Sequence, residues 1–214
     1  MIQISEVLAA LASKRPIFHS EAEFQNALAW EIQQELPNAS LRLELPVEVK
    51  NQCLHVDIWA TTPDEVLAIE LKYKTRGLSV LVNGEDFYLK DHSAQDIGRY
   101  DILKDVRRLE QITTERRNAT GYAILLTNDS AYWTIPTNPH TVYADFRIDD
   151  GRTLEGVLDW GVNAGPGTKK DREQPIVLRD KYLVKWEEYS RPSSATYGLF
   201  RSLAIKVTQD QEVS

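Results

Sequence analysis

Apolar residues near the start of the chain recur with helical spacing. Residues 2–13 carry apolar side chains three or four positions apart, which predicts a short amphipathic helix. A second helix is predicted to begin after Ser20, a residue type that caps helix N-termini, and to end before Pro37. Its apolar stripe consists of Phe24, Ala27, Leu28 and Ile32.

Three strand-like segments follow in close succession. They are Leu41–Val49, Leu54–Ala60 and Val66–Tyr73, and the tetrapeptide at 61–64 forms a turn between the last two. We therefore predict three neighbouring strands, with the second and third joined as an antiparallel hairpin.

The second half of the chain begins with a loop and a long helix. A Gly- and Asn-containing loop is predicted at 77–86 and a helix at roughly 95–117. Gly121–Thr127 is short and almost wholly apolar, as in strands that are buried on both faces and parallel to a neighbour. Gly151–Gly167 is interpreted as loop-rich, and Tyr182–Tyr189 and Leu199–Val207 as a late pair of strands.

The order of these elements indicates an α/β fold with one domain over residues 1–214. A core would occupy about 18–127, and residues 128–214 would add further β elements to it. The composition, 42% hydrophobic and 27% charged, is that of an ordinary globular protein that buries a core.

Net charge and cysteine content argue against some classes of function and of structure. The net charge of −7 argues against coating nucleic acid through a wide basic surface, so any contact with phosphates is expected to be local. Cys53 is the only cysteine, which excludes an intrachain disulfide and fits a reducing compartment such as the cytoplasm. The sequence shows no signal peptide and no apolar run long enough for a membrane.

The candidate chemistry lies in the predicted hairpin. If the hairpin is symmetric about Pro63 and Asp64, Asp57 pairs with Glu70 and their carboxylates share one face. Side chains alternate along a strand, so Lys72 lies on that face too. Two acids and one amine are therefore expected to converge.

Such a pair of carboxylates calls for a cation or a raised pKa. Mg²⁺ or Mn²⁺ fits, with the backbone carbonyl of Leu71 as a further oxygen ligand beside Asp57 and Glu70. A bound divalent ion polarises a phosphodiester and lowers the pKa of water. Lys72 would orient that water, deprotonate it or stabilise the transition state, and the sequence leaves these roles open.

Chance matches to this pattern are common. Glu48-Val49-Lys50 has the same Glu-x-Lys form without any preceding Asp, and it serves as an internal control. The competing interpretation of the Asp57 hairpin is a solvated charge cluster at a sheet edge.

The order helix, strand, Asp-bearing strand, Glu-x-Lys strand, helix, strand resembles the PD-(D/E)XK nuclease superfamily. The resemblance covers about residues 18–127 and departs from the family pattern in that Val56, not Pro, precedes Asp57. It implies a restriction endonuclease-like core (αβββαβ) with a mixed four-stranded sheet flanked by helices. It further implies a metal-dependent nuclease acting on DNA, and a possible homodimer, with Asp57 and Glu70 as magnesium ligands and Lys72 assisting hydrolysis.

The same resemblance suggests additional site residues. Glu23 stands where many members carry a metal-binding Glu in the first core helix, although Ser20 and Glu23 also form a capping box. Gln95 stands where some members place a Gln facing the site, on one helix face with Asp91 and Arg99.

Basic residues around the predicted site are candidates for phosphate contacts. Lys74 and Arg76 follow the Glu-x-Lys strand and are expected to bind nucleic acid, unless they belong to a solvated strand end. The pair Arg107-Arg108 is interpreted as solvated surface. The rival functions are an inactive interaction module on the same fold and a hydrolase of small phosphate-containing molecules.

Overall fold

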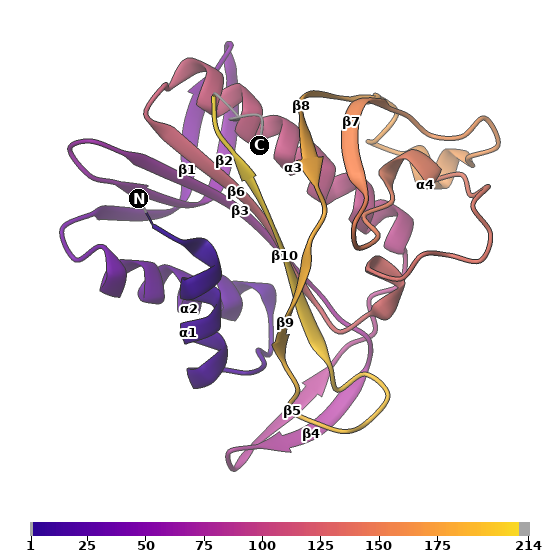
Figure 1. Cartoon of the computed structure of the whole chain (residues 1–214), viewed down its shortest axis with the longest axis horizontal. Helices are drawn as coiled ribbons and strands as arrows, with labels where there is room; N and C mark the ends of the chain where they lie inside the picture. Colours follow the sequence, from indigo (N-terminus) through magenta and orange to yellow (C-terminus); the bar gives the residue numbers. More distant parts are fainter. Residues whose placement is uncertain (1, 210–214) are drawn as a thin grey trace.

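The computed structural model describes residues 2–209 as an α/β structure built on one mixed sheet (Figure 1). Six strands lie in the order β1-β2-β3-β6-β10-β9. The first four are β1 (Ser40–Val49), β2 (Gln52–Thr61), β3 (Val66–Lys74) and β6 (Ala119–Thr127). All four strands predicted for the core are therefore confirmed, and β3 and β6 are parallel as expected for a buried crossover.

Helices cover both faces of the sheet. Helices α1 (Ile4–Lys14) and α2 (Glu21–Glu35) share one apolar core with the sheet, and α3 (Gln95–Glu115) shares the other (Figure 1). The Ser20 hydroxyl accepts a hydrogen bond from the Glu23 amide at 3.1 Å, which confirms the predicted N-cap of α2.

The loop predicted at 77–86 is a β-hairpin, so that prediction is wrong. Strands β4 (Leu78–Val82) and β5 (Glu85–Leu89) flank Asn83 and Gly84, which both have positive φ. Asn-Gly is the favoured pair for a two-residue hairpin turn, because it tolerates this conformation. The hairpin projects from the end of β3 (Figure 1).

The C-terminal half departs from prediction in two places. The segment predicted as one strand at Tyr182–Tyr189 is divided between β8 (Ile176–Leu183) and β9 (Trp186–Ser190), which belong to different sheets. The loop-rich region contains β7 (Thr153–Leu158), which pairs with β8, and the short helix α4 (Pro166–Lys169). The last predicted strand is present as β10 (Phe200–Val207) and extends the sheet beside β6.

Strands β1 and β2 change the core they pack against halfway along their length. In β1, Leu43 packs with the α1 and α2 side and Val47 with the α3 side, although both positions share one parity. In β2, Ile58 and Val56 divide in the same way. Between the two halves, Glu44 has φ of 50°, a left-handed conformation that strains a non-glycine residue. The pair of strands β1 and β2 therefore kinks at Glu44, beside Asp57.

Within residues 2–209, no helix combines the length and the apolar character that crossing a bilayer requires.

Candidate active site

The predicted hairpin register is present, but it ends one residue short of the candidate acids. Ile58 pairs with Ile69 and Thr61 with Val66, as symmetry about the turn requires. Beyond this point, Asp57 Oδ2 accepts the Leu71 amide at 2.7 Å, so a side chain replaces the backbone ladder. The kink thus opens the sheet between β2 and β3, at the position of Asp57 and Glu70.

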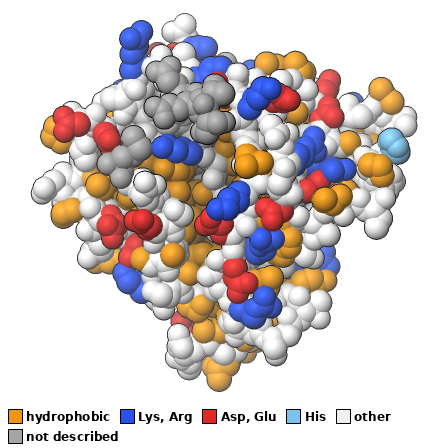
Figure 2. Space-filling view, in the orientation of Figure 1, with side chains coloured by type: hydrophobic (Ala, Val, Ile, Leu, Met, Phe, Trp, Pro, Cys, Tyr) orange, Lys and Arg blue, Asp and Glu red, His pale blue; other side chains and the backbone are white. Residues whose placement is uncertain are grey.

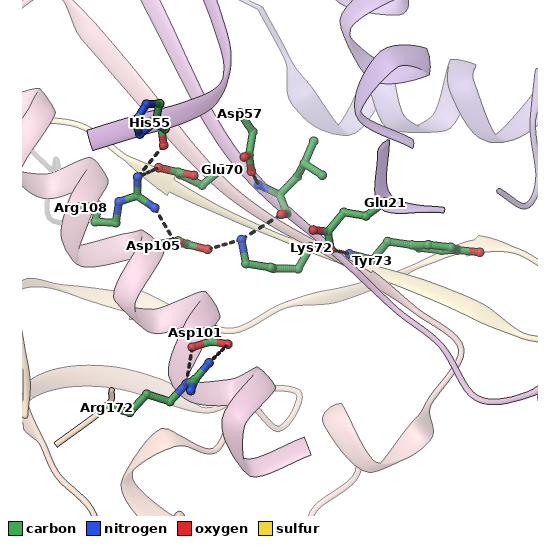
Figure 3. A network of polar contacts seen from close by, with 11 residues as sticks. Glu21, His55, Asp57, Glu70, Lys72, Tyr73, Asp101, Asp105, Arg108 and Arg172 are labelled. Atoms are coloured by element: carbon green, nitrogen blue, oxygen red, sulfur yellow. Dashed lines mark hydrogen bonds and ion pairs between the residues drawn. The ribbon is translucent and has the colours of Figure 1, made fainter. Parts of the chain in front are cut away.

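Glu70 points toward α3 (Figure 3). Its side chain is 1% exposed, and Oε1 lies 3.1 Å from Nη2 of Arg108. Arg108 also contacts Asp105 at 3.3 Å and donates to the His55 carbonyl. The interpretation of Arg108 as solvated surface is therefore wrong, because its guanidinium bridges α3 to both strands of the open hairpin.

Lys72 is held between its own strand and α3. Its ammonium lies 2.9 Å from Asp105 Oδ2 and donates to the Leu71 carbonyl at 3.1 Å (Figure 3). Asp105 is 4% exposed, so this ion pair lies largely outside solvent. The predicted trio of Asp57, Glu70 and Lys72 is brought together, with Asp105 and Arg108 added from α3.

The pKa values reflect this crowding of charges. Burial and the neighbouring Asp105 raise the pKa of Glu70 to about 9. Burial also raises the pKa of Asp57, although the Leu71 amide and Lys72 partly offset this effect. Burial alone would lower the pKa of Lys72, but the negative charge of the neighbouring Asp105 raises it, so Lys72 is an ammonium.

Gln25 connects helix α2 to the kink. Gln25 is 9% exposed. Its side-chain amide donates to Glu44 Oε1 at 2.7 Å and to the Asp57 carbonyl at 2.8 Å. Glu44 in turn contributes to the raised pKa of Asp57 through the repulsion between the two carboxylates. Gln25 therefore fixes the strained Glu44 against Asp57, a relationship that hydrophobic patterning does not reveal.

The carboxylates of this region are of the kind that binds a hard divalent cation. Among the described residues, no group of three or more His, Cys, Asp and Glu side chains is arranged as a complete metal site. Mg²⁺, however, is usually bound by one or two carboxylates and keeps several waters. Glu70 Oε1 and Asp105 Oδ2 are buried and have only ion-pair contacts, without hydrogen-bond geometry. A cation would satisfy such oxygens and favour ionised Glu70.

The acid that helix α2 directs to this region is Glu21. Glu21 Oε2 accepts the Tyr73 amide at 2.7 Å, next to Lys72 in β3 (Figure 3). Glu23 instead accepts from Arg15 at 3.0 Å and from the His19 amide at 2.7 Å. The structure thus directs Glu23 away from the trio and into helix capping, because its position lies on a different side of α2 from Glu21.

Gln95 does not join the trio either. Its amide donates to Asp129 at 2.8 Å, at the N-terminus of α3. Arg99 on the same face is 4% exposed and packs over Tyr132 and Tyr143. This face of α3 therefore fastens the segment after β6, while Asp105 and Arg108, about three turns further along, face the open hairpin.

The two residues predicted to contact nucleic acid differ in their surroundings. Arg76 pairs with Asp91 at 3.0 Å and stacks over Tyr197, so its charge is satisfied within the fold. Lys74 is half-buried and has no ion pair with any described residue. Of the two, Lys74 alone keeps a charge that is available to a ligand.

A groove of about 680 Å³ opens onto this region. One wall is a face of α3 that carries Lys104, Arg107 and Arg108, and the opposite wall is the first half of β2, from Gln52 to Asp57. Asp57 and Arg108 line the groove, whereas Glu70 lies behind Arg108 and Lys72 is not among the lining residues. Access to Glu70 from the groove therefore passes the Arg108 guanidinium.

The C-terminal half supplies the end of this groove. Arg172 forms a two-fold ion pair with Asp101, at 2.7 and 2.9 Å, and Tyr100 donates to the Gln174 carbonyl at 2.9 Å. Trp160 stacks on Tyr100 with ring centroids 5.6 Å apart. Residues 171–174 are thereby fixed against α3, so part of the C-terminal region shapes the groove.

Positive and negative side chains are interspersed on the face of the molecule shown in Figure 2, in keeping with a net charge of −7.

No protein-family model matches the chain, and comparisons with curated proteins and with solved structures give no match.

Proposed function

We propose that this chain is a divalent-metal-dependent nuclease that hydrolyses phosphodiester bonds of DNA, with a restriction endonuclease-like core of the PD-(D/E)XK kind. One observation carries the proposal. Asp57, Glu70 and Lys72 meet where the kinked β2 leaves β3, beside a groove that Asp57 lines and that has a basic wall. The strained backbone at Glu44 supports it, because such strain is found preferentially at functional sites.

The metal-binding groups would be the carboxylates of Asp57 and Glu70 and the carbonyl of Leu71. A bound Mg²⁺ or Mn²⁺ supplies Lewis-acid polarisation of the phosphodiester and a water of lowered pKa. The Leu71 carbonyl faces Lys72, whose ammonium contacts it at 3.1 Å, so the lysine and this ligand lie side by side.

Lys72 is suited to stabilising negative charge. Its ion pair with the buried Asp105 holds the ammonium in place at 2.9 Å. A protonated amine donates hydrogen bonds to a phosphate or an attacking water, and it does not remove a proton. Among the roles that the sequence left open, the geometry favours orientation of the water and stabilisation of the transition state.

Arg108 is the cation that contacts Glu70 in the metal-free protein. Its guanidinium lies 3.1 Å from Glu70 and also lines the groove. A phosphate that enters the groove competes with Glu70 for this guanidinium, because Arg binds phosphate and carboxylate in the same bidentate manner. Arg108 is thus placed to move from Glu70 to the substrate.

A second candidate is an inactive interaction module on the same fold. The observation in its favour is that Glu70 contacts Arg108 and Lys72 contacts Asp105, so each of these buried groups has a partner without any metal ion. Buried ion networks of this kind also occur as purely structural features.

The test is cleavage of linear, circular, single-stranded and branched DNA with Mg²⁺ or Mn²⁺. Wild type is compared with Asp57→Ala and Lys72→Ala, and with Lys50→Ala, which alters the control Glu-x-Lys segment. We expect metal-dependent cleavage that falls by about two to four orders of magnitude in the two site variants and persists in the control. Absence of cleavage in the wild type with every substrate and both ions would leave the interaction module as the better account.

A further inference from the structure

One wall of the groove carries cations that the fold does not use. Lys104 is exposed and Arg107 half-buried, and neither forms an ion pair with any residue in the range 2–209. Elsewhere, Arg76, Arg147 and Arg172 each pair with an acid within 3.0 Å. The charges of Lys104 and Arg107 are therefore available to a ligand.

These cations are aligned along α3. Lys104, Arg107, Arg108 and Gln111 follow one another at helical spacing and all line the groove. The span from Lys104 to Gln111 is about 10 Å at the helical rise of 1.5 Å per residue. A nucleic-acid backbone that follows α3 over this length therefore passes more than one of these side chains.

The rest of the groove restricts how a ligand lies in it. His55 is exposed on the β2 wall and offers an aromatic ring on which a base can stack. Asp171 and Glu173 stand at the end formed by the C-terminal region, where they repel phosphates. A polyanion is thereby directed along α3 toward Arg108 and Asp57.

We infer that the α3 wall is the phosphate-contact surface for one strand of a nucleic acid, with Lys104 and Arg107 binding its backbone and His55 facing its bases. This inference rests on the proposed nuclease function and names how its substrate enters the site. The groove volume of about 680 Å³ lies in the range of pockets for small ligands, so it receives a few nucleotides of one strand, whereas a whole duplex does not enter it.

The test is binding of a fluorescently labelled 20-nucleotide single strand by anisotropy, in EDTA so that no hydrolysis accompanies binding. The variant Lys104→Ala with Arg107→Ala is compared with Lys185→Ala with Arg191→Ala. This control removes the same charges from the two ends of β9, where both residues are paired with acids. We expect the groove variant to bind about tenfold or more weakly at low salt. We also expect its plot of log affinity against log salt to flatten by about 1.4, or about 0.7 for each lost phosphate contact.

Unlabelled duplex, a dinucleotide and inorganic phosphate serve as competitors. Competition by the dinucleotide as strong as that by the 20-nucleotide strand would overturn the inference in favour of a small phosphate ligand. Equal affinity and equal salt dependence in the two double variants, or no binding by the wild type, would also overturn it. Cleavage is measured separately. If the wild type cleaves DNA but the two double variants bind alike, the α3 contact surface is refuted and the nuclease function is not. If the expected binding pattern is found without cleavage, the nuclease function is refuted and the contact surface is not.

Discussion

The ammonium of Lys72 on β3 lies 2.9 Å from Oδ2 of Asp105 on α3. The contact crosses from the sheet to the helix, and the Asp105 side chain is 5% exposed. Removing Asp105 leaves Lys72 as a largely buried charge without an ion-pair partner, which is costly. Lys72, to which the sequence assigned a chemical role, is therefore also part of a structural link between the sheet and α3.

The first prediction concerns this link. Asp105→Asn should lower the free energy of unfolding by about 3 kcal/mol, because Lys72 loses its charge partner. A double-mutant cycle of Asp105→Asn and Lys72→Met, in which urea denaturation measures each free energy of unfolding, should give a coupling energy above about 1 kcal/mol. The exposed pair of Lys185 and Glu187 is the control and should give less than 1 kcal/mol. Equal coupling in the two cycles would contradict the structural role of Asp105.

The second prediction concerns the backbone at Glu44. A left-handed φ of 50° favours glycine over alanine by about 1 kcal/mol, so Glu44→Gly should be more stable than Glu44→Ala. Both variants lose the carboxylate, so the comparison isolates the backbone. At Arg42, an exposed position two residues earlier in the same strand, alanine should be the more stable of the two. If alanine were the more stable residue at both positions, the kink at Glu44 would be absent in solution.

The third prediction concerns pH. Glu70 ionises at about 4.5 in an unfolded chain and at about 9 in the folded, metal-free protein. Between these values the folded state holds a proton that the unfolded state has released, so Glu70 makes folding less favourable as pH rises. Relative to Glu70→Gln, the wild type should therefore lose stability steadily from pH 5 to pH 9. Denaturant titrations at each pH measure this difference. A difference that stays constant would show that Glu70 is ionised throughout.

The fourth prediction separates the two acids of helix α2. Glu21→Gln weakens the contact with the Tyr73 amide beside Lys72 and should reduce cleavage by about tenfold. Glu23→Gln alters only the contacts with Arg15 and the His19 amide and should keep cleavage within about twofold of the wild type. The rates under saturating metal ion compare the two variants directly. The reverse order would restore Glu23 to the site.

Local patterns were sufficient to predict much of the fold. The strands β1 and β2, the apolar run of β6 and the Ser20 cap were each predicted from a few neighbouring residues, and all four features are present. The hairpin at Asn83 was missed although Asn-Gly carries its own turn signal. The division of β8 from β9 depends on which distant strands they join, and no local pattern encodes it.

The site was predicted in part for the same reason. Strand periodicity places Asp57, Glu70 and Lys72 together, but it says nothing about which turn of α3 lies above them. Asp105 carried a signal, because it interrupts an apolar stripe between Ile102 and Leu109. Glu110 is buried in the same helix and binds the backbone and Tyr182 of β8 instead, so the signal marks burial rather than chemistry.

Calorimetric titration of the metal-free protein with Mn²⁺ measures whether Asp57 and Glu70 bind a divalent ion. At pH 8 we expect one site that is lost in both Asp57→Asn and Glu70→Gln and kept in Glu48→Gln, the control segment. Binding should release about one proton, because Glu70, with a pKa of about 9, must ionise to become a ligand. No binding, or equal binding by the wild type and both site variants, would contradict the metal site and leave the charges as a structural network.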